Sequence, residues 1–146
     1  MGVSKQEYKR MVEVASPKSQ LGLNCFKAYV VGGCICVLGQ GLYNIFEAAG
    51  AGRDMAGTLV AMSLITLGVL LTGLGVFDNL VKFGGAGASV PITGFANAMA
   101  APAIEFKKEG HIMGVGAKMF LIAGPVIVYG TLASMVVGVI YYFVRT

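Results

Sequence analysis

The stretch AYVVGGCICVLGQGLYNIF, residues 28–46, contains 19 positions without a charged residue, and Lys27 and Glu47 bracket it. A helix of about 20 apolar residues is long enough to cross the hydrocarbon core of a bilayer. Gln40 and Asn44 lie four positions apart, so they share one helix face, which we expect to point at protein or a polar cavity and not at lipid. A simple hydrogen bond between helices is the alternative interpretation of this pair.

Two further uncharged runs of similar length follow, at residues 55–77 and 120–144. The whole chain of 146 residues is 56% hydrophobic and only 12% charged, whereas a soluble domain averages about 25% charged residues. The sequence therefore predicts an all-α integral membrane protein with three transmembrane helices, at about 28–46, 55–77 and 120–144. A soluble α/β protein with a rich core is the alternative that these long runs disfavour.

Small residues recur at four-residue spacing within the second and third runs. Gly68 and Thr72 form such a pair, and Gly130, Ser134 and Gly138 form a longer ridge. Small residues at this spacing let the backbones of neighbouring membrane helices approach closely. We therefore expect both sets to be helix-packing sites, the ridge packing against another helix of this subunit or of a second one.

The stretch FGGAGASVPITGFANAMAAPAIE, residues 83–105, is apolar enough to enter a bilayer but too rich in glycine, proline and small polar residues for a lipid-facing helix. Every fourth position carries a polar or small residue: Ser89, Thr93, Asn97, Ala101 and Glu105. In a helix these residues form one slowly drifting stripe. Ser89 is expected to cap a helix with Pro91 in its first turn, and Pro102 to kink or end that helix.

Lysine and arginine counts favour a re-entrant or broken helical segment at about 84–105 over a fourth span. With three spans, nine of the eleven Lys and Arg residues lie on the inner side and two on the outer side. If residues 84–105 also cross, the division becomes seven against four. The first division obeys the positive-inside rule better. Irregular backbone at membrane depth must then be buried in protein or line a water-filled cavity.

No catalytic constellation is visible, so the chain is not expected to be an enzyme, to bind a metal or to need a cofactor. His111 lies in a charged segment without a nucleophile nearby, and the cysteines show no metal-ligand spacing. Backbone N–H groups near Ser89 could attract an anion, with Lys82 or Lys118 adding positive charge. A plain packing loop is the alternative interpretation of this glycine-rich stretch.

The polar extension of residues 1–24 precedes a single membrane domain of residues 25–146. Residues 4–15 favour a short amphipathic helix on the membrane surface, because Tyr8, Met11 and Val12 share one side and Ser4 with Glu7 fits a capping box. A partly disordered tail is the alternative. The extension lacks an apolar signal-peptide core, so we expect the first span to act as its own membrane signal.

Two stretches, VGGCICVLGQGL at 31–42 and FGGAGASVPITGFANAMA at 83–100, resemble the stage V sporulation protein AC family, which includes a related AE-type membrane protein. The resemblance runs from about residue 16 to the C-terminus. It implies a location in the inner membrane of the forespore and spore, and partners among the other membrane proteins of the stage V sporulation operon A. It also implies uptake of dipicolinic acid, as the calcium chelate, during sporulation, and its release during germination. No binding residues are carried over from the family.

The resemblance and the residue pattern together predict an oligomeric channel or transport subunit for dipicolinic acid, which the family's properties suggest is mechanosensitive. Few charges lie within the expected membrane segments, so a polar route must use backbone dipoles, hydroxyls and amides. The pore-lining or ligand-lining candidates are Ser89, Thr93, Asn97, Glu105, Lys82, Lys118, Gln40 and Asn44. A structural scaffold that anchors other components of the same complex without conducting is the alternative function.

Overall fold

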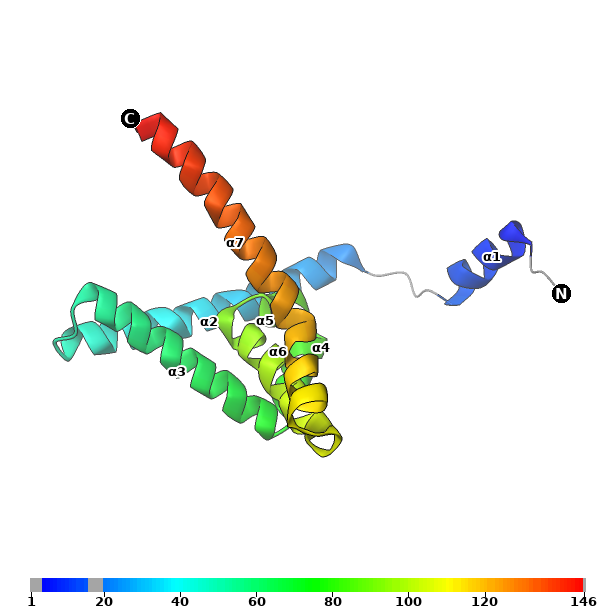
Figure 1. Cartoon of the computed structure of the whole chain (residues 1–146), viewed down its shortest axis with the longest axis horizontal. Helices are drawn as coiled ribbons and strands as arrows, with labels where there is room; N and C mark the ends of the chain where they lie inside the picture. Colours follow the sequence, from blue (N-terminus) through cyan, green and yellow to red (C-terminus); the bar gives the residue numbers. More distant parts are fainter. Residues whose placement is uncertain (1–3, 16–19, 146) are drawn as a thin grey trace.

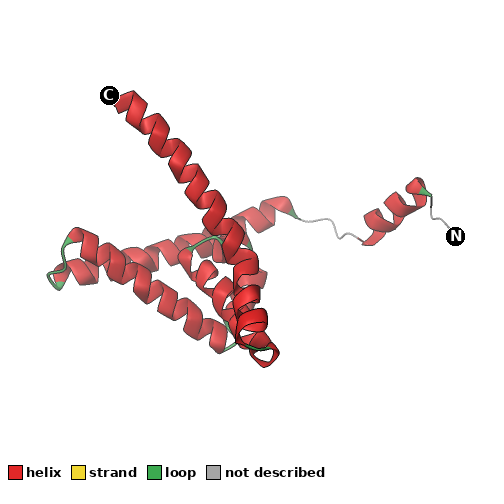
Figure 2. Ribbon diagram, in the orientation of Figure 1, coloured by secondary structure: helices red, strands yellow, loops and turns green. Residues whose placement is uncertain are grey.

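The computed structural model describes residues 4–15 and 20–145 of the chain. Every regular element in these residues is helical (Figure 2), and none of them forms a strand. The α-helices are α1 Lys5–Ala15, α2 Leu21–Ala48, α3 Arg53–Gly73, α4 Phe77–Gly84, α5 Ala86–Ser89, α6 Ile92–Glu105 and α7 Ala117–Arg145. A 3-10 turn at Phe106–Glu109 and a π-helical turn at His111–Gly116 connect α6 to α7. The predicted all-α fold is confirmed.

Within the described residues, three helical stretches are long and apolar enough to cross a bilayer: Leu21–Ala48, Arg53–Gly73 and His111–Arg145. They coincide with the three predicted runs, so the predicted set of transmembrane helices is confirmed. The first and third stretches extend beyond the apolar runs, because polar residues near a helix end do not by themselves interrupt the helix. The second stretch ends at Gly73, four residues before the predicted boundary at 77.

Glycines in the left-handed conformation end the first two of these helices. Gly75, after α3, has a φ of 70°, and Gly50, after α2, has a φ of 93°. The N–H of Gly75 donates to the carbonyl of Thr72 at 3.0 Å. The N–H of Val76 donates to the carbonyl of Leu71, also at 3.0 Å. This pair of bonds is a Schellman motif, which satisfies carbonyls at a helix end and explains why α3 stops before Phe77.

The segment from α4 to α6 occupies the space between α2 and α3, which diverge from the turn that joins them (Figure 1). α4 and α5 contact α2, whereas α6 contacts α3 and the start of α7. The helix is interrupted at Gly85, with a φ of 52°, and again at Pro91, which has an extended ψ of 166°. The predicted broken helical segment at about 84–105 is therefore confirmed.

α6 runs in the same direction as α3. Gly68 lies against Thr93, and Thr72 lies against Asn97 one turn further along both helices. With 14 residues, α6 is about 21 Å long, which is shorter than the hydrocarbon core of about 30 Å. Because α6 is parallel to α3, the C-terminal ends of both helices lie on the same side of the membrane. This geometry favours the re-entrant arrangement over a fourth span.

Glycine contacts hold the broken segment in place. A Cβ at Gly87 would overlap the Ala28 carbonyl of α2, and a Cβ at Gly84 would lie 2.8 Å from the Val31 side chain. On the other side, a Cβ at Gly68 would lie 2.9 Å from the Thr93 carbonyl oxygen. The predicted close approach at Gly68 is thus confirmed. These contacts require glycine because any side chain would push the helices apart.

The predicted capping and proline effects in this segment are only partly correct. Ser89 does not cap α6, because its hydroxyl donates to the Gly85 carbonyl at 3.0 Å and the helix has no side-chain cap. Pro91 is the N-cap residue instead of a first-turn residue. Pro102 lies inside α6, which continues to Glu105, so this proline does not end the helix.

Most of α7 lies outside the packed body. Ala123 is fully buried, but every residue from Pro125 to Arg145 is exposed in the single chain. Figure 1 shows this part of α7 projecting away from the other helices. The predicted ridge of Gly130, Ser134 and Gly138 therefore has no packing partner within the described part of this subunit.

We predict that Gly87→Ala destabilises the folded protein by about 1–3 kcal/mol, because the added methyl overlaps the α2 backbone. Gly57→Ala on α3 is the matched control, since a Cβ there meets nothing within 4 Å. Helix propensity alone makes this control neutral or stabilising by up to about 1 kcal/mol. Denaturant unfolding of the detergent-solubilised protein measures both changes, and equal stabilities would contradict the close contact.

Candidate functional site

A cleft of about 290 Å³ opens between α4, the α5–α6 segment and α7. Its wall includes Val81 of α4, Ser89 of α5, and Ile122 of α7. The polar stripe supplies the rest of its polar lining, through Asn97 and Glu105 of α6. The tertiary structure thus brings three of the predicted pore-lining residues to one cleft.

Thr93, the remaining polar member of the stripe, faces α3 and does not line this cleft. Its side chain is only 5% exposed, and its hydroxyl oxygen has no hydrogen-bond partner. The four-residue spacing rotates each successive side chain by about 40° around a helix. The break at Pro91 further separates the register of Ser89 from that of α6, so the five stripe residues cannot all face one direction.

Asn97 connects the cleft to the α3–α6 contact. The Thr72 hydroxyl lies 2.8 Å from Asn97 Oδ1 and 2.7 Å from the Gly68 carbonyl oxygen. Since a hydroxyl has one proton, the two oxygens compete for a single donor. The interaction fixes the Asn97 side chain at the cleft wall, and it joins two helices far apart in the sequence.

Glu105 is the charged residue that lines the cleft, at its end near the 3-10 turn. Its carboxylate is exposed, and no ion pair joins it to another described residue. The remaining lining consists of a hydroxyl, an amide, small residues and apolar side chains. The cleft therefore offers hydrogen-bonding oxygens and one negative charge, a combination that suits cations or neutral polar solutes better than free anions.

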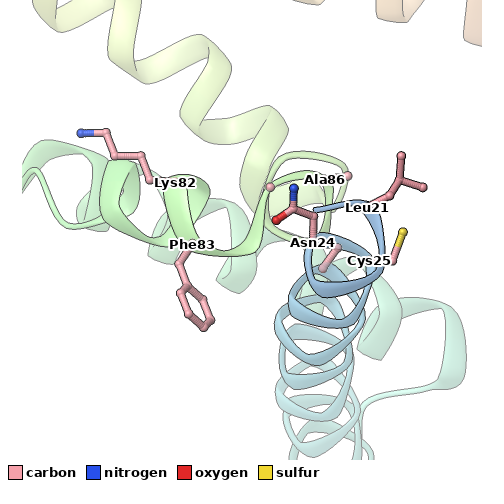
Figure 3. Close-up of a pocket in the computed structure, with 8 residues that line it drawn as sticks. Leu21, Asn24, Cys25, Lys82, Phe83 and Ala86 are labelled. Carbon is pink, nitrogen blue, oxygen red and sulfur yellow. The ribbon is translucent and has the colours of Figure 1, made fainter. Parts of the chain in front are cut away.

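Lys82 lines a different hollow, of about 340 Å³, between the start of α2 and the α4–α5 junction. Asn24 and Phe83 also line it, and Lys27 lies over the Phe83 ring with Nζ 5.1 Å from the ring centroid. In Figure 3 the Lys82 side chain extends away from Asn24. Lys82 therefore adds positive charge beside this second hollow and not within the polar cleft.

The other polar candidates lie outside the cleft. Lys118 is partly buried, with Nζ 4.7 Å from the centroid of the Phe106 ring. Gln40 and Asn44 share an exposed face of α2, where the Gln40 amide donates to Asn44 Oδ1 at 2.9 Å. The two side chains share one face, as expected, but in the single chain this face is exposed and lines neither the cleft nor the second hollow. Their hydrogen bond lies within α2, so it is not the bond between helices that was the alternative interpretation.

Sequence reasoning missed several residues that shape the site. Val81 and Ile122 form its apolar walls, and neither belongs to a polar or small-residue pattern. Gly94 also lines the cleft, and a Cβ there would overlap the carbonyls of Ala88 and Ser89 at the tight α5–α6 connection. The small-residue spacing did identify Thr72, but not its bond to Asn97.

The chain matches known proteins over most of its length. A family model described as SpoVAC/SpoVAEB sporulation membrane protein matches residues 24–140. Stage V sporulation protein AC of Bacillus subtilis (strain 168) is 45% identical over 139 residues, which cover 94% of this chain and 93% of that protein. No solved structure matches the chain.

We predict that Thr72 and Asn97 stabilise the fold cooperatively, with a coupling energy of about 0.5–1.5 kcal/mol, as for other hydrogen bonds between membrane helices. A double-mutant cycle with Thr72→Val and Asn97→Ala, followed by unfolding in detergent, measures this coupling. The control cycle combines Asn97→Ala with Thr66→Val, because the exposed Thr66 hydroxyl bonds to the Met62 carbonyl of its own helix at 2.8 Å, and we expect this pair to be additive. Additive effects of Thr72→Val and Asn97→Ala would mean that the bond does not hold α6 against α3.

Proposed function

Because this chain belongs to the SpoVAC/SpoVAEB sporulation membrane protein family, we propose that it is a transport subunit for dipicolinic acid. It carries the acid, as its calcium chelate, across the inner membrane of the forespore during sporulation and of the spore during germination. The observation that supports this proposal most directly is the polar cleft beside an interrupted helix. A span that served only as an anchor would need neither feature.

The interrupted backbone gives the cleft its polar character. Ser89 and Asn97 present a hydroxyl and an amide next to the break between α5 and α6. Membrane transporters place discontinuous helices at their solute sites, because freed backbone groups replace the water that a solute loses. The same arrangement lets a polar solute pass a chain whose spanning helices carry few charges.

The charge of the cleft favours the calcium chelate over the free dianion. Glu105 contributes a carboxylate, which repels a free dicarboxylate but attracts a bound calcium ion. Lys82 belongs to another hollow, so it does not neutralise Glu105 inside the cleft. A chelate in which calcium offsets the two carboxylates is the form of the solute that this lining accommodates best.

The route requires more than one subunit. Three spanning helices enclose too little space for a continuous pore, and the cleft is open along one side. α7 supplies a surface for assembly, because its residues from Pro125 to Arg145 are exposed within the single chain. We infer that other copies, or other membrane proteins of the same operon, complete the wall.

Membrane tension is a physically reasonable stimulus for opening. α2 and α3 diverge, and the broken segment is held between them by contacts at Gly87 and Gly68. Tension favours states of larger area in the membrane plane, so it favours further separation of these two helices. Such separation loosens α5 and α6 and widens the cleft between them and α7.

A scaffold role is the second candidate function. The exposed ridge of Gly130, Ser134 and Gly138 favours it, since small residues at this spacing serve helix association whether or not solute passes. Purified protein in liposomes that contain calcium dipicolinate tests whether copies of this chain conduct the solute by themselves. Release on osmotic downshift supports a conducting subunit, whereas intact vesicles would favour a scaffold or a channel that needs its partners.

We predict that Ala101→Leu sharply lowers the dipicolinic acid content of spores, because a large apolar side chain blocks and dries the cleft. Ala101 carries no polar group, so the effect reports on the route itself. Gly41→Leu on α2 is the matched control, as a Cβ at Gly41 meets nothing within 4 Å and the residue does not line the cleft. The dipicolinate content of purified spores is measured alongside protein level in the membrane. If Ala101→Leu spores have a normal level of the protein and a wild-type dipicolinic acid content, the solute does not pass through this cleft.

A further inference from the structure

The helix before the membrane domain is stabilised by its own side chains. In α1, the Ser4 N–H donates to Glu7 Oε2 at 3.4 Å, and the Glu7 N–H donates to Ser4 Oγ at 3.3 Å. This reciprocal pair confirms the predicted capping box, which satisfies two N–H groups at the helix start. α1 therefore has a local reason to be helical without support from the rest of the protein.

One face of α1 is apolar and uncovered. Met11 and Val12 follow Tyr8 by three and four positions, so the three side chains share that face, and they are 52%, 44% and 63% exposed, respectively. Lys5 and Lys9, one turn apart, flank the face along one edge, and Gln6 lies on the opposite side. Figure 1 shows α1 apart from the packed helices. The apolar face is thus available to an external partner.

The length of the chain places α1 next to the membrane surface. Six residue steps separate Ala15 from Leu21, the first residue of the spanning helix α2. Even a fully extended chain covers about 20 Å over that length. The first 27 residues carry five Lys or Arg and two Glu, so this end of the protein has a net charge of +3. A tethered, cationic, amphipathic helix at this position meets lipid headgroups before any other partner.

We propose that α1 lies in the headgroup region of the membrane as a docking helix for anionic phospholipid. Tyr8, Met11 and Val12 enter the boundary between headgroups and acyl chains, and the lysines reach lipid phosphates from the edge of the helix. Positive charges close to an anionic leaflet strengthen such binding. α1 thereby fixes how deep and at what angle the start of α2 sits, independently of what the membrane domain conducts.

The absence of tryptophan from the chain allows a direct test. Tyr8→Trp and Met11→Trp each introduce a single fluorophore on the apolar face, and Gln6→Trp is the matched control on the opposite face. The full-length protein is reconstituted in vesicles of phosphatidylglycerol and phosphatidylcholine, with or without brominated acyl chains. We expect blue-shifted emission and strong quenching by brominated lipid for Tyr8→Trp and Met11→Trp, but neither for Gln6→Trp.

Replacing the lysines tests the electrostatic part of the proposal. The double substitution Lys5→Gln and Lys9→Gln is made in the Tyr8→Trp protein. In anionic vesicles we expect it to lower the equilibrium constant for membrane binding of α1, as measured by quenching, on the order of fivefold per lysine. Neutral vesicles show no such change, and Arg53→Gln, at the start of α3, is without effect in either. Raised salt reproduces the loss because it screens the same charges.

Three results would overturn the proposal. Water-like, unquenched emission from all three tryptophans would show that α1 stays in solution. Blue-shifted emission that brominated lipid does not quench would place the apolar face on the protein's own membrane domain. Emission that shifts with the protein-to-lipid ratio at fixed lipid composition would identify a second copy of the chain as the occupant.

Discussion

Close backbone contact at Gly87 and Gly68 allows an interrupted helix to lie among spanning helices. Inside a bilayer, backbone groups that a helix does not pair must find partners in the protein or in trapped water. The segment from α4 to α6 breaks its own helix twice, at Gly85 and Pro91. It is tolerated because α2 and α3 flank it closely, and those contacts are possible because glycine replaces a side chain on each side.

The cleft follows from the same contacts. Because α6 is drawn against α3, its other side turns toward α7 and exposes Glu105 there. Asn97 lies at the boundary, where it accepts a hydrogen bond from Thr72 of α3 and also lines the cleft. Thr93, by contrast, does not line the cleft, because it is buried where α6 packs against α3. Helix-packing and cleft-lining residues thus lie close together along one short helix, and a shift of α6 relative to α3 would change both contacts together.

The surface that we propose for assembly, on α7, is separate from this packed region. α7 joins the body through its first turns, near Ala123, and then extends beyond it with apolar residues on all sides. Lipid covers such a helix as readily as protein does, so hydrophobicity alone does not select a partner. In our proposal, the small residues of the ridge, Gly130, Ser134 and Gly138, let another helix pack closely against α7 where lipid chains do not.

The sequence by itself determined the three spanning helices, the broken segment and the capping box of α1. Each of these follows from local chemistry: the length of an uncharged run, the glycines and prolines of residues 84–105, and the spacing of Ser4 and Glu7. The sequence could not show that Thr93 is buried outside the cleft while Asn97 reaches both α3 and the cleft. It also could not show that Lys82 borders another hollow, or that Val81 and Ile122 form the walls. Tertiary structure decided these points, because the break at Pro91 resets the helix register and the contacts at Gly68 and Gly87 fix the rotation of the segment. Residue spacing specifies which side chains share a face, but only packing between helices specifies what that face meets.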